Sequence, residues 1–312
     1  MSNVKIKISI VVPCFNEEDV ILNTHERLTS VLLEMKESYE IIYISDGSSD
    51  KTNHLLDGIY INNSNNVKII ELSRNFGHQV AVTAGIDHAI GDVVILIDAD
   101  LQDPPELIPD MVEKWNEGYQ VVYCQRKKRN GESKFKIATA KIFYRVMAYL
   151  SDVKIPVDTG DFRLMDRKVV EVLQNMPERD RFIRGLVAWV GFKQFALKYD
   201  REERFAGVTK YPFWKMVRFA VDGILSFSIK PLRLSILLGL ISSLFAFVGI
   251  VYAIIMWLTG APVLGWTLMF IAILFFGGVQ LIGLGIIGEY VGRSYYESKR
   301  RPLYIVRNKS GF

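Results

Sequence analysis

The stretch VVILIDADLQDPPE, residues 93–106, joins an apolar run to a cluster of carboxylates. An apolar run of this length that ends before a proline pair is typical of a buried central strand. Side chains alternate between the two faces of a strand, so Asp98, Asp100 and Gln102 share one face if the chain stays extended. Their oxygen atoms suit Mg²⁺, which typically takes one or two carboxylates and completes its shell with phosphate oxygens and water. The stretch therefore predicts a metal and phosphate site.

The same stretch also has a simpler interpretation as a turn that caps the next helix. Asp103 has the character of an N-cap residue, with Pro104 at the first helical position and Glu106 placed for a capping box. Capping accounts for Asp103 and leaves Asp98 and Asp100 unexplained, so we favour the metal site.

Composition separates a polar part of the chain from an apolar part. Half of the 312 residues are hydrophobic, and most of the surplus lies in the last third. The net charge is only +4, but basic residues cluster at 126–129 and 299–301, which favours anionic phosphates or lipid head groups as partners over nucleic acid. Cys14 and Cys124 fall in or beside expected strands, which favours a reduced, cytosolic domain. Residues 1–7 are polar, so we expect no signal peptide.

Short apolar runs alternate with helical patterns over the first 124 residues. Strands are expected at 6–12, 40–45, 67–72, 93–97 and 120–124, with helices at about 17–35, after 50, at 79–89 and from 104. This alternation predicts an α/β fold with a mostly parallel sheet and helices on both faces. Ligands of such sheets bind beyond the carboxyl ends of the strands. The polar clusters that follow the strands, at 13–18, 46–50, 73–78 and 98–103, should therefore face one crevice.

The glycine motifs of dinucleotide folds and P-loop NTPases are not found after any expected strand. Instead, the segments VVPCFNEE, SDGSSDKT, LSRNFGHQVAVTAGIDHAIGD and DADLQDPPE, in this order, resemble the family 2 glycosyltransferases of the GT-A fold. Over nearly the whole chain they are similar to polyprenyl-phosphate glycosyltransferases, such as the bactoprenol glucosyltransferases and the enzymes like dolichol-phosphate mannosyltransferase. The resemblance implies that the nucleotide-sugar is bound by Pro13, Phe15, Glu17, Asp46, Asp98 and Ala99. It also implies Mg²⁺ or Mn²⁺ on Asp98, Asp100 and Gln102.

Resemblance to the same family assigns the acceptor side. Arg126, Lys136 and Lys210 would bind the acceptor phosphate, and Arg204 would act with Asp161 in catalysis. Asp161 would occupy the position of the catalytic base, although its segment, 158–167, also reads as a tight turn before a helix. Because a monophosphate ester has a second pKa of about 6, the attacking oxygen is already mostly an anion at neutral pH. Asp161 would then position a substrate more than remove a proton.

The last third of the sequence predicts a membrane anchor. Residues 211–228 have the pattern of an interfacial amphipathic helix, and two apolar spans without Lys or Arg follow at about 234–258 and 266–287. The outer flanks of the spans are basic and their connection is uncharged, so the positive-inside rule places both termini in the cytosol and the protein in the cytoplasmic membrane. Glycines in the second span would allow close helix contact, as in a homo-oligomer such as a tetramer.

The predicted organisation is a GT-A domain at 1–210, an interfacial helix at 211–231, a two-helix transmembrane hairpin at 232–291 and a cytosolic tail at 292–312. The predicted function is inverting, metal-dependent transfer of a hexose from a nucleotide-sugar to polyprenyl (undecaprenyl) monophosphate on the cytosolic leaflet. Resemblance favours UDP-glucose as donor. UDP-GlcNAc, a UDP-aminoarabinose-type sugar and GDP-mannose remain alternatives, as does a non-catalytic membrane adaptor that binds nucleotides. A processive synthase is disfavoured because two spans make no polymer channel.

Overall fold

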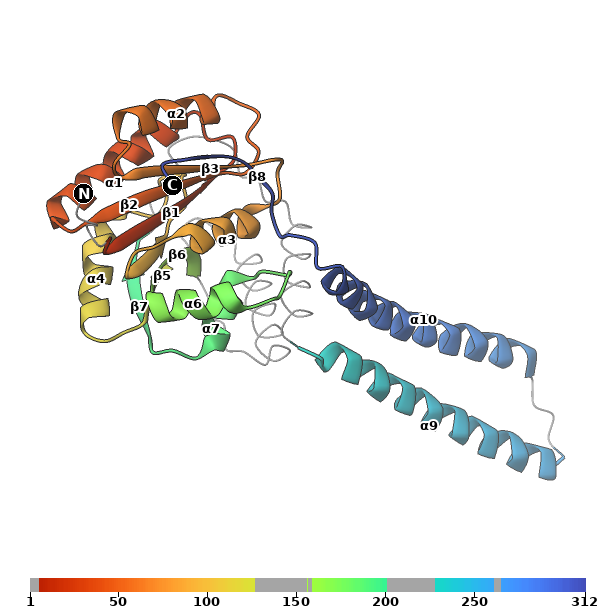
Figure 1. Cartoon of the computed structure of the whole chain (residues 1–312). Helices are drawn as coiled ribbons and strands as arrows, with labels where there is room; N and C mark the ends of the chain where they lie inside the picture. Colours follow the sequence, from red (N-terminus) through yellow and green to blue (C-terminus); the bar gives the residue numbers. More distant parts are fainter. Residues whose placement is uncertain (1–5, 127–155, 157–158, 201–227, 261–264) are drawn as a thin grey trace. The chain divides into compact units, whose positions relative to one another are not determined.

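A computed structural model describes residues 6–126, 156, 159–200, 228–260 and 265–312 (Figure 1). These residues form two compact units. Unit 1 contains residues 6–126, 156, 159–200 and 301–312, and unit 2 contains residues 228–260 and 265–300.

Unit 1 is built on an eight-stranded sheet with the order β7-β5-β6-β4-β1-β2-β3-β8. The strands are β1 (Ile8–Cys14), β2 (Tyr39–Ser45), β3 (Val67–Leu72), β4 (Val93–Leu96), β5 (Val121–Arg126), β6 (Thr159–Asp166), β7 (Gln194–Tyr199) and β8 (Val306–Ser310). Strands β6 and β8 run antiparallel to their neighbours, and the other pairs are parallel. The mostly parallel α/β fold is confirmed.

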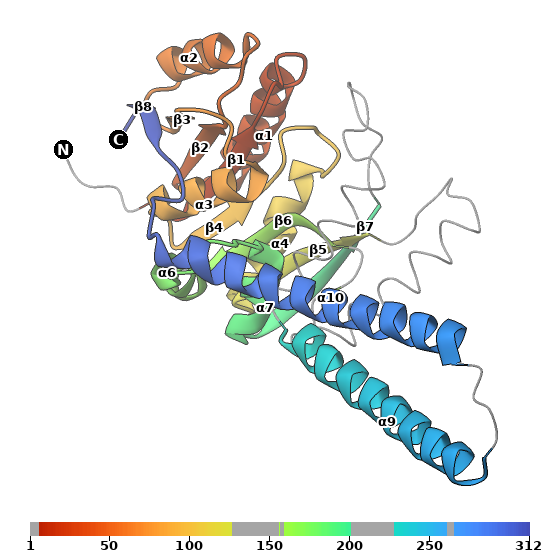
Figure 2. The same ribbon diagram turned by 90° about the vertical axis from the view of Figure 1, so that its right-hand side faces the viewer.

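Helices cover both faces of this sheet (Figures 1 and 2). They are α1 (Ile21–Met35), α2 (Thr52–Asn62), α3 (His78–His88), the 3₁₀ helix η1 (Pro105–Leu107), α4 (Ile108–Asn116), α6 (Arg167–Asn175) and α7 (Ile183–Val190). Ile8, Ile10 and Val12 of β1 belong to one hydrophobic core with residues of α1, α2 and α4. On the opposite face, α3 approaches Val11 and Ile44 closely at Gly85.

Three segments differ from the simplest expectation. Strand β4 ends at Leu96 and the chain turns at residues 99–100, where Leu101 has φ +58°, so the chain is not extended through Gln102. The segment around Asp161 is the antiparallel strand β6 and not a turn before a helix. Residues 306–310, assigned to a tail, form the edge strand β8.

Strand β7 ends and strand β8 begins at the same edge of the sheet of unit 1. Strand β7 is parallel to β5 and ends at Tyr199, and β8 begins with Val306 opposite Leu72, the last residue of β3. Both positions are at the carboxyl edge of the parallel strands, where Asp98 follows β4 and Asp161 stands near the start of antiparallel β6. The end of β7 and the start of β8 therefore lie on the side of the sheet where ligands are expected.

Unit 2 contains two long apolar helices, α9 (Lys230–Leu258) and α10 (Gly265–Ser298). Both are long and apolar enough to cross a membrane, and no residue of the most apolar 18-residue window of either helix is buried. Tyr290 of α10 donates a hydrogen bond to the Ser228 carbonyl at 2.6 Å. Most of the predicted interfacial helix, 211–231, lies outside the described residues.

We predict that Gly85→Ala destabilises unit 1. A Cβ at this position would lie 2.2 Å from Val11 Cγ1 and 2.7 Å from Ile44 Cδ1, so α3 would have to shift away from the sheet. Overpacking of this kind costs about 1–3 kcal/mol, which thermal unfolding of the full-length protein in detergent will report. The matched control is Gly58→Ala in α2, where a Cβ meets nothing within 4 Å. It should stabilise by about 0.5–1 kcal/mol, and equal melting of the two variants would contradict the prediction.

Candidate functional site

The loops after β1 and β2 form one surface. Asn16 Oδ1 accepts the Ser49 N–H at 2.8 Å, and the Glu17 N–H donates to Thr52 Oγ1 at 2.9 Å. Phe15 is 38% exposed beside them, whereas Pro13 is buried within β1. The first two polar clusters therefore lie together, as their places after parallel strands predicted. Nucleoside binding by Pro13, Phe15 and Glu17 stays a prediction.

Asp46 ties the loop after β3 to the end of β2. Its buried carboxylate accepts the N–H groups of Phe76 and Gly77 at 2.7 and 2.9 Å. Burial raises the pKa of Asp46, and these two hydrogen bonds oppose the rise. The next residue, Gly47, has φ +65°, and a Cβ there would lie 2.4 Å from the Arg74 carbonyl carbon, so only glycine fits. The observed role of Asp46 is to hold this loop, and its contact with a nucleoside stays a prediction.

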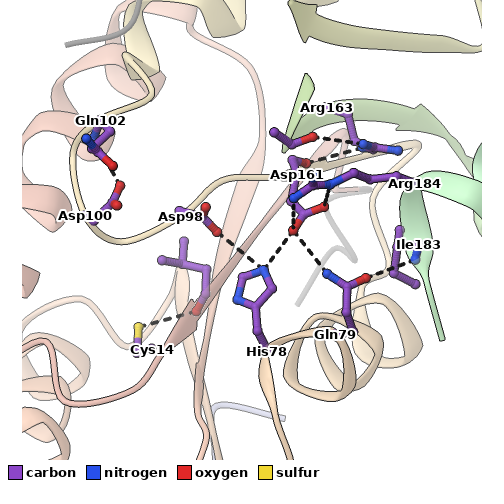
Figure 3. A network of polar contacts seen from close by, with 12 residues as sticks. Cys14, His78, Gln79, Asp98, Asp100, Gln102, Asp161, Arg163, Ile183 and Arg184 are labelled. Atoms are coloured by element: carbon purple, nitrogen blue, oxygen red, sulfur yellow. Dashed lines mark hydrogen bonds and ion pairs between the residues drawn. The ribbon is translucent and has the colours of Figure 1, made fainter. Parts of the chain in front are cut away.

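Asp161 is the centre of a polar cluster formed by side chains of α3, β6 and α7 (Figure 3). Its side chain is 5% exposed. Its Oδ1 accepts a hydrogen bond from Arg184 Nε at 2.7 Å, and its Oδ2 accepts one from Arg184 Nη2 at 3.3 Å. His78 Nε2 and Gln79 Nε2 lie 3.0 and 3.1 Å from Oδ2. Gln79 also accepts the Ile183 N–H at 3.0 Å, which connects α3 to the start of α7. Helices α3 and α7 thus converge on one carboxylate of β6.

A second carboxylate, Asp98, joins the cluster through His78. Asp98 Oδ1 lies 3.6 Å from His78 Nε2, and Figure 3 shows the histidine directed between the two aspartates. Asp98 follows β4, so the end of β4 meets the starts of α3, β6 and α7 here. The arrangement alternates negative and positive side chains across the site.

These neighbours set the protonation of the cluster. Burial alone would raise the pKa of Asp161, but Arg184 and His78 hold it well below its ordinary value. Partial burial opposes the charge on His78, yet Asp98 and Asp161 raise its pKa to about 9. Burial raises the pKa of Asp98, with His78 acting in the opposite direction. At neutral pH the site therefore holds an ionised Asp161 between two cations.

The proposed metal ligands lie on the turn that follows β4. Asp98 is directed at His78, whereas Asp100 accepts the Gln102 N–H at 3.2 Å, so the shared strand face predicted for the three side chains is wrong (Figure 3). No group of three or more His, Cys, Asp or Glu side chains within the described ranges is placed to hold a metal. Two carboxylates and an amide oxygen still fit Mg²⁺ or Mn²⁺ when phosphate oxygens complete the shell. Metal binding here stays a prediction.

Contacts from two elements, α1 and β7, fix this turn. Thr24 of α1 donates to the Ala99 carbonyl at 2.7 Å, and Arg27 binds Glu106 through two bonds of 2.6 and 2.8 Å. The buried Asp103 accepts a hydrogen bond from the Tyr199 hydroxyl. Neither η1 nor α4 has a side-chain cap, so the capping roles expected of Asp103 and Glu106 are wrong.

Arg126 ends β5 beside the start of β6. A Cβ on Gly160, the residue before Asp161, would lie 3.3 Å from Arg126 Nη2. The glycine therefore leaves room for the Arg126 guanidinium. Burial raises the pKa of the Tyr199 hydroxyl, and the nearby Arg126 guanidinium opposes this rise. The structure thus brings Arg126 to the site, although its contact with an acceptor stays a prediction. Lys136, Arg204 and Lys210 lie outside the described residues.

The motifs missed three members of the cluster. His78 belonged to a polar cluster but received no role, and Gln79 and Arg184 received none either. Their contacts with Asp161 span 83, 82 and 23 residues of sequence. No local pattern indicates such pairing, because it arises only when the sheet order places β6 beside β4.

Comparison with known proteins identifies the family. The family model "Glycosyl transferase family 2" matches residues 9–173. The chain belongs to glycosyl transferase family 2. It is 52% identical to the uncharacterized glycosyltransferase sll0501 of Synechocystis, over 98% of this chain and 96% of that protein. It is 50% identical to glycosyltransferase YkcC of Bacillus subtilis, over 98% and 95%. It is 43% identical to the bactoprenol glucosyl transferase of Shigella phage SfV, over 97% and 99%. The protein is therefore a glycosyltransferase.

We predict that Arg184→Met lowers the free energy of unfolding by about 2–4 kcal/mol, because it leaves the buried Asp161 charge without its two-bond partner. In an Asp161→Asn background the same change should cost much less, since no charge is left uncompensated. Thermal or urea unfolding of the four proteins measures the coupling, expected at about 1–3 kcal/mol. An equal cost in both backgrounds would contradict this account of the cluster.

Proposed function

We propose that this glycosyltransferase moves a hexose, with UDP-glucose as the favoured donor, to polyprenyl monophosphate. The observation that carries the proposal is the Asp98–His78–Asp161–Arg184 cluster at the carboxyl edge of a family 2 sheet. The similar Shigella phage protein is named a bactoprenol glucosyl transferase and matches over 99% of its length.

The apolar part of the chain supports a lipid acceptor. Two helices are long and apolar enough to cross a membrane. An acceptor with a long hydrocarbon tail stays in a bilayer and presents only its phosphate. We therefore propose a membrane location with the catalytic unit and both termini in the cytosol, organised as domains at 1–210, 211–231, 232–291 and 292–312. A homo-oligomer belongs to the same proposal.

In the proposed reaction an oxygen of the acceptor phosphate attacks the anomeric carbon of the donor. The new carbon–oxygen bond forms as the bond to the diphosphate breaks, so one displacement inverts the anomeric centre and releases the nucleoside diphosphate. Mg²⁺ or Mn²⁺ held by Asp98, Asp100 and Gln102 would neutralise charge on the departing diphosphate. The nucleoside would lie on the Phe15 and Glu17 surface.

Asp161 acts in this scheme by holding cations rather than by removing a proton. Its pKa is held well below the ordinary value, which makes it a weak base. The acceptor needs no base, because its second pKa is about 6. Asp161 instead orients Arg184 and His78, whose positive charges face the reacting phosphates. Arg126, with Arg204, Lys136 and Lys210, would bind the acceptor phosphate.

A lipid-labelling experiment tests the proposal. Purified full-length protein is incubated with undecaprenyl phosphate, Mg²⁺ and radiolabelled UDP-glucose, UDP-GlcNAc, a UDP-aminoarabinose-type sugar or GDP-mannose, with and without chelator. We expect label in the lipid phase from UDP-glucose and its loss with chelator. Labelled lipid from a different donor would change the assignment of the sugar. Labelling that survives the chelator would contradict the proposed metal dependence. No labelled lipid from any donor would favour the nucleotide-binding adaptor.

We predict that Asp98→Asn lowers kcat at least about 100-fold, because it removes one charge from the metal and diphosphate site. The melting temperature should stay close to that of the wild type, since Asp98 is about one-third exposed. Glu117→Gln is a matched control, as Glu117 is an exposed carboxylate paired only with Lys114 among the contacts that the structure shows at that position. Retained transfer by Asp98→Asn would remove this residue from the proposed site.

A further inference from the structure

The C-terminal strand contacts the parts of unit 1 that lead into the donor-side loops. Strand β8 pairs with β3, the Ser73 N–H donates to the Ile305 carbonyl at 2.9 Å, and the Tyr304 hydroxyl donates to Asp87 of α3 at 2.9 Å. The C-terminal residues therefore belong to unit 1, which carries the Asp161 cluster, although they follow the apolar helices in the sequence.

Arg307 of β8 holds the start of the β3–α3 loop. Its Nη2 donates to the Ser73 carbonyl at 2.9 Å, while the Ser73 N–H is held by Ile305. The same loop continues to Phe76 and Gly77, whose N–H groups bind Asp46, and then to His78 of the cluster. The backbone that carries His78 is thus fixed at its start by the C-terminal strand.

A second series of contacts runs from Arg307 to the loop after β1. Arg307 Nη1 donates to Glu71 Oε1 at 3.0 Å. From Glu71 the contacts pass to Asn53 (3.4 Å), Ser45 (2.5 Å), Ser48 (3.1 Å) and the Asn16 N–H (3.2 Å). Asn16 lies between Phe15 and Glu17, so one guanidinium is connected to both loops expected to hold the donor.

We propose that Arg307 is a positioning residue that sets the arrangement of the donor-side loops and thereby the affinity for the nucleotide-sugar. The proposal rests on the proposed function for the identity of the donor. A planar guanidinium can satisfy Glu71 and the Ser73 carbonyl together, whereas the single ammonium of lysine is not shaped for both acceptors. Residues after the apolar helices would thus contribute to donor binding without touching the donor.

A merely structural role predicts a different outcome. The Arg307 side chain is 60% exposed, and exposed ion pairs contribute little to stability. The backbone pairing of β8 with β3 does not depend on this side chain. Lys309 offers a matched control on the same strand, because it lies 2.6 Å from His88 at the other end of α3. Loss of either cation should therefore change the melting temperature to a similar extent. Only the loss of Arg307 should weaken the affinity for the donor.

The experiment compares Arg307→Ala, Arg307→Lys and Lys309→Ala in the full-length protein in detergent. Donor KM and kcat are measured with UDP-glucose and undecaprenyl phosphate, together with the melting temperature. Arg307→Ala should raise the donor KM roughly three- to tenfold with kcat within about twofold and the acceptor KM unchanged, as expected for lost hydrogen bonds in a binding site. Arg307→Lys should recover part of the loss, and Lys309→Ala should match the wild type. Equal donor KM for Arg307→Ala and Lys309→Ala overturns the proposal.

Calorimetric titration with UDP and with GDP separates this inference from the proposed function. If the wild type binds a nucleoside diphosphate but transfers no sugar to lipid, the proposed function fails. Weaker binding of that diphosphate to Arg307→Ala than to Lys309→Ala would still support the role of Arg307. If the two variants bind it equally, or if no diphosphate binds the wild type, the positioning role is overturned.

Discussion

The buried ion pair between Asp161 and Arg184 is the interaction on which the rest of the site depends. A carboxylate that is 5% exposed cannot stay ionised without partners, and Arg184 supplies two bonds in the geometry that guanidinium and carboxylate share. Because Arg184 also donates to the Thr159 carbonyl, it fixes the start of β6. His78 and Gln79 then contact the Asp161 carboxylate, which Arg184 already holds in place. The pair therefore determines where α3, α7 and β6 meet.

Much of the sheet was predictable because it is encoded locally. The run at 67–72 forms β3 at the predicted bounds, and the alternation of strands and helices up to residue 124 correctly indicated parallel strands. Strand β6 was not predicted, since TGDFRLMD mixes charges with glycine and is buried only through its neighbours β4 and β5. Strand β8 was missed for a similar reason, because VRNKS has little apolar character and pairs at an edge.

The site was predictable where it follows strands and unpredictable where it depends on tertiary pairing. Asp98 and Asp161 were identified from family-like motifs, but only the structure shows that His78 lies between them. The expected face of Asp98, Asp100 and Gln102 required an extended chain, and the strand ends two residues before Asp98 instead. The pattern of apolar residues predicts that a strand forms, but it does not predict the residue at which the strand ends. Turn geometry here depends on Thr24, Arg27 and Tyr199, which lie far away in sequence.

The charge balance of the cluster constrains how it can handle phosphates. Asp98 and Asp161 carry two negative charges when ionised, and His78 and Arg184 carry two positive ones, so these four side chains sum to about zero. A sugar diphosphate and a phosphate monoester would together add roughly three to four negative charges at neutral pH. Further cations are needed to hold both anions close enough to react. Arg126 at the end of β5 supplies one within the described residues, and a divalent ion on the turn after β4 would supply two more. The raised pKa of Asp98 agrees with this requirement, since burial and the adjacent carboxylates outweigh the effect of His78, and a bound cation would offset them.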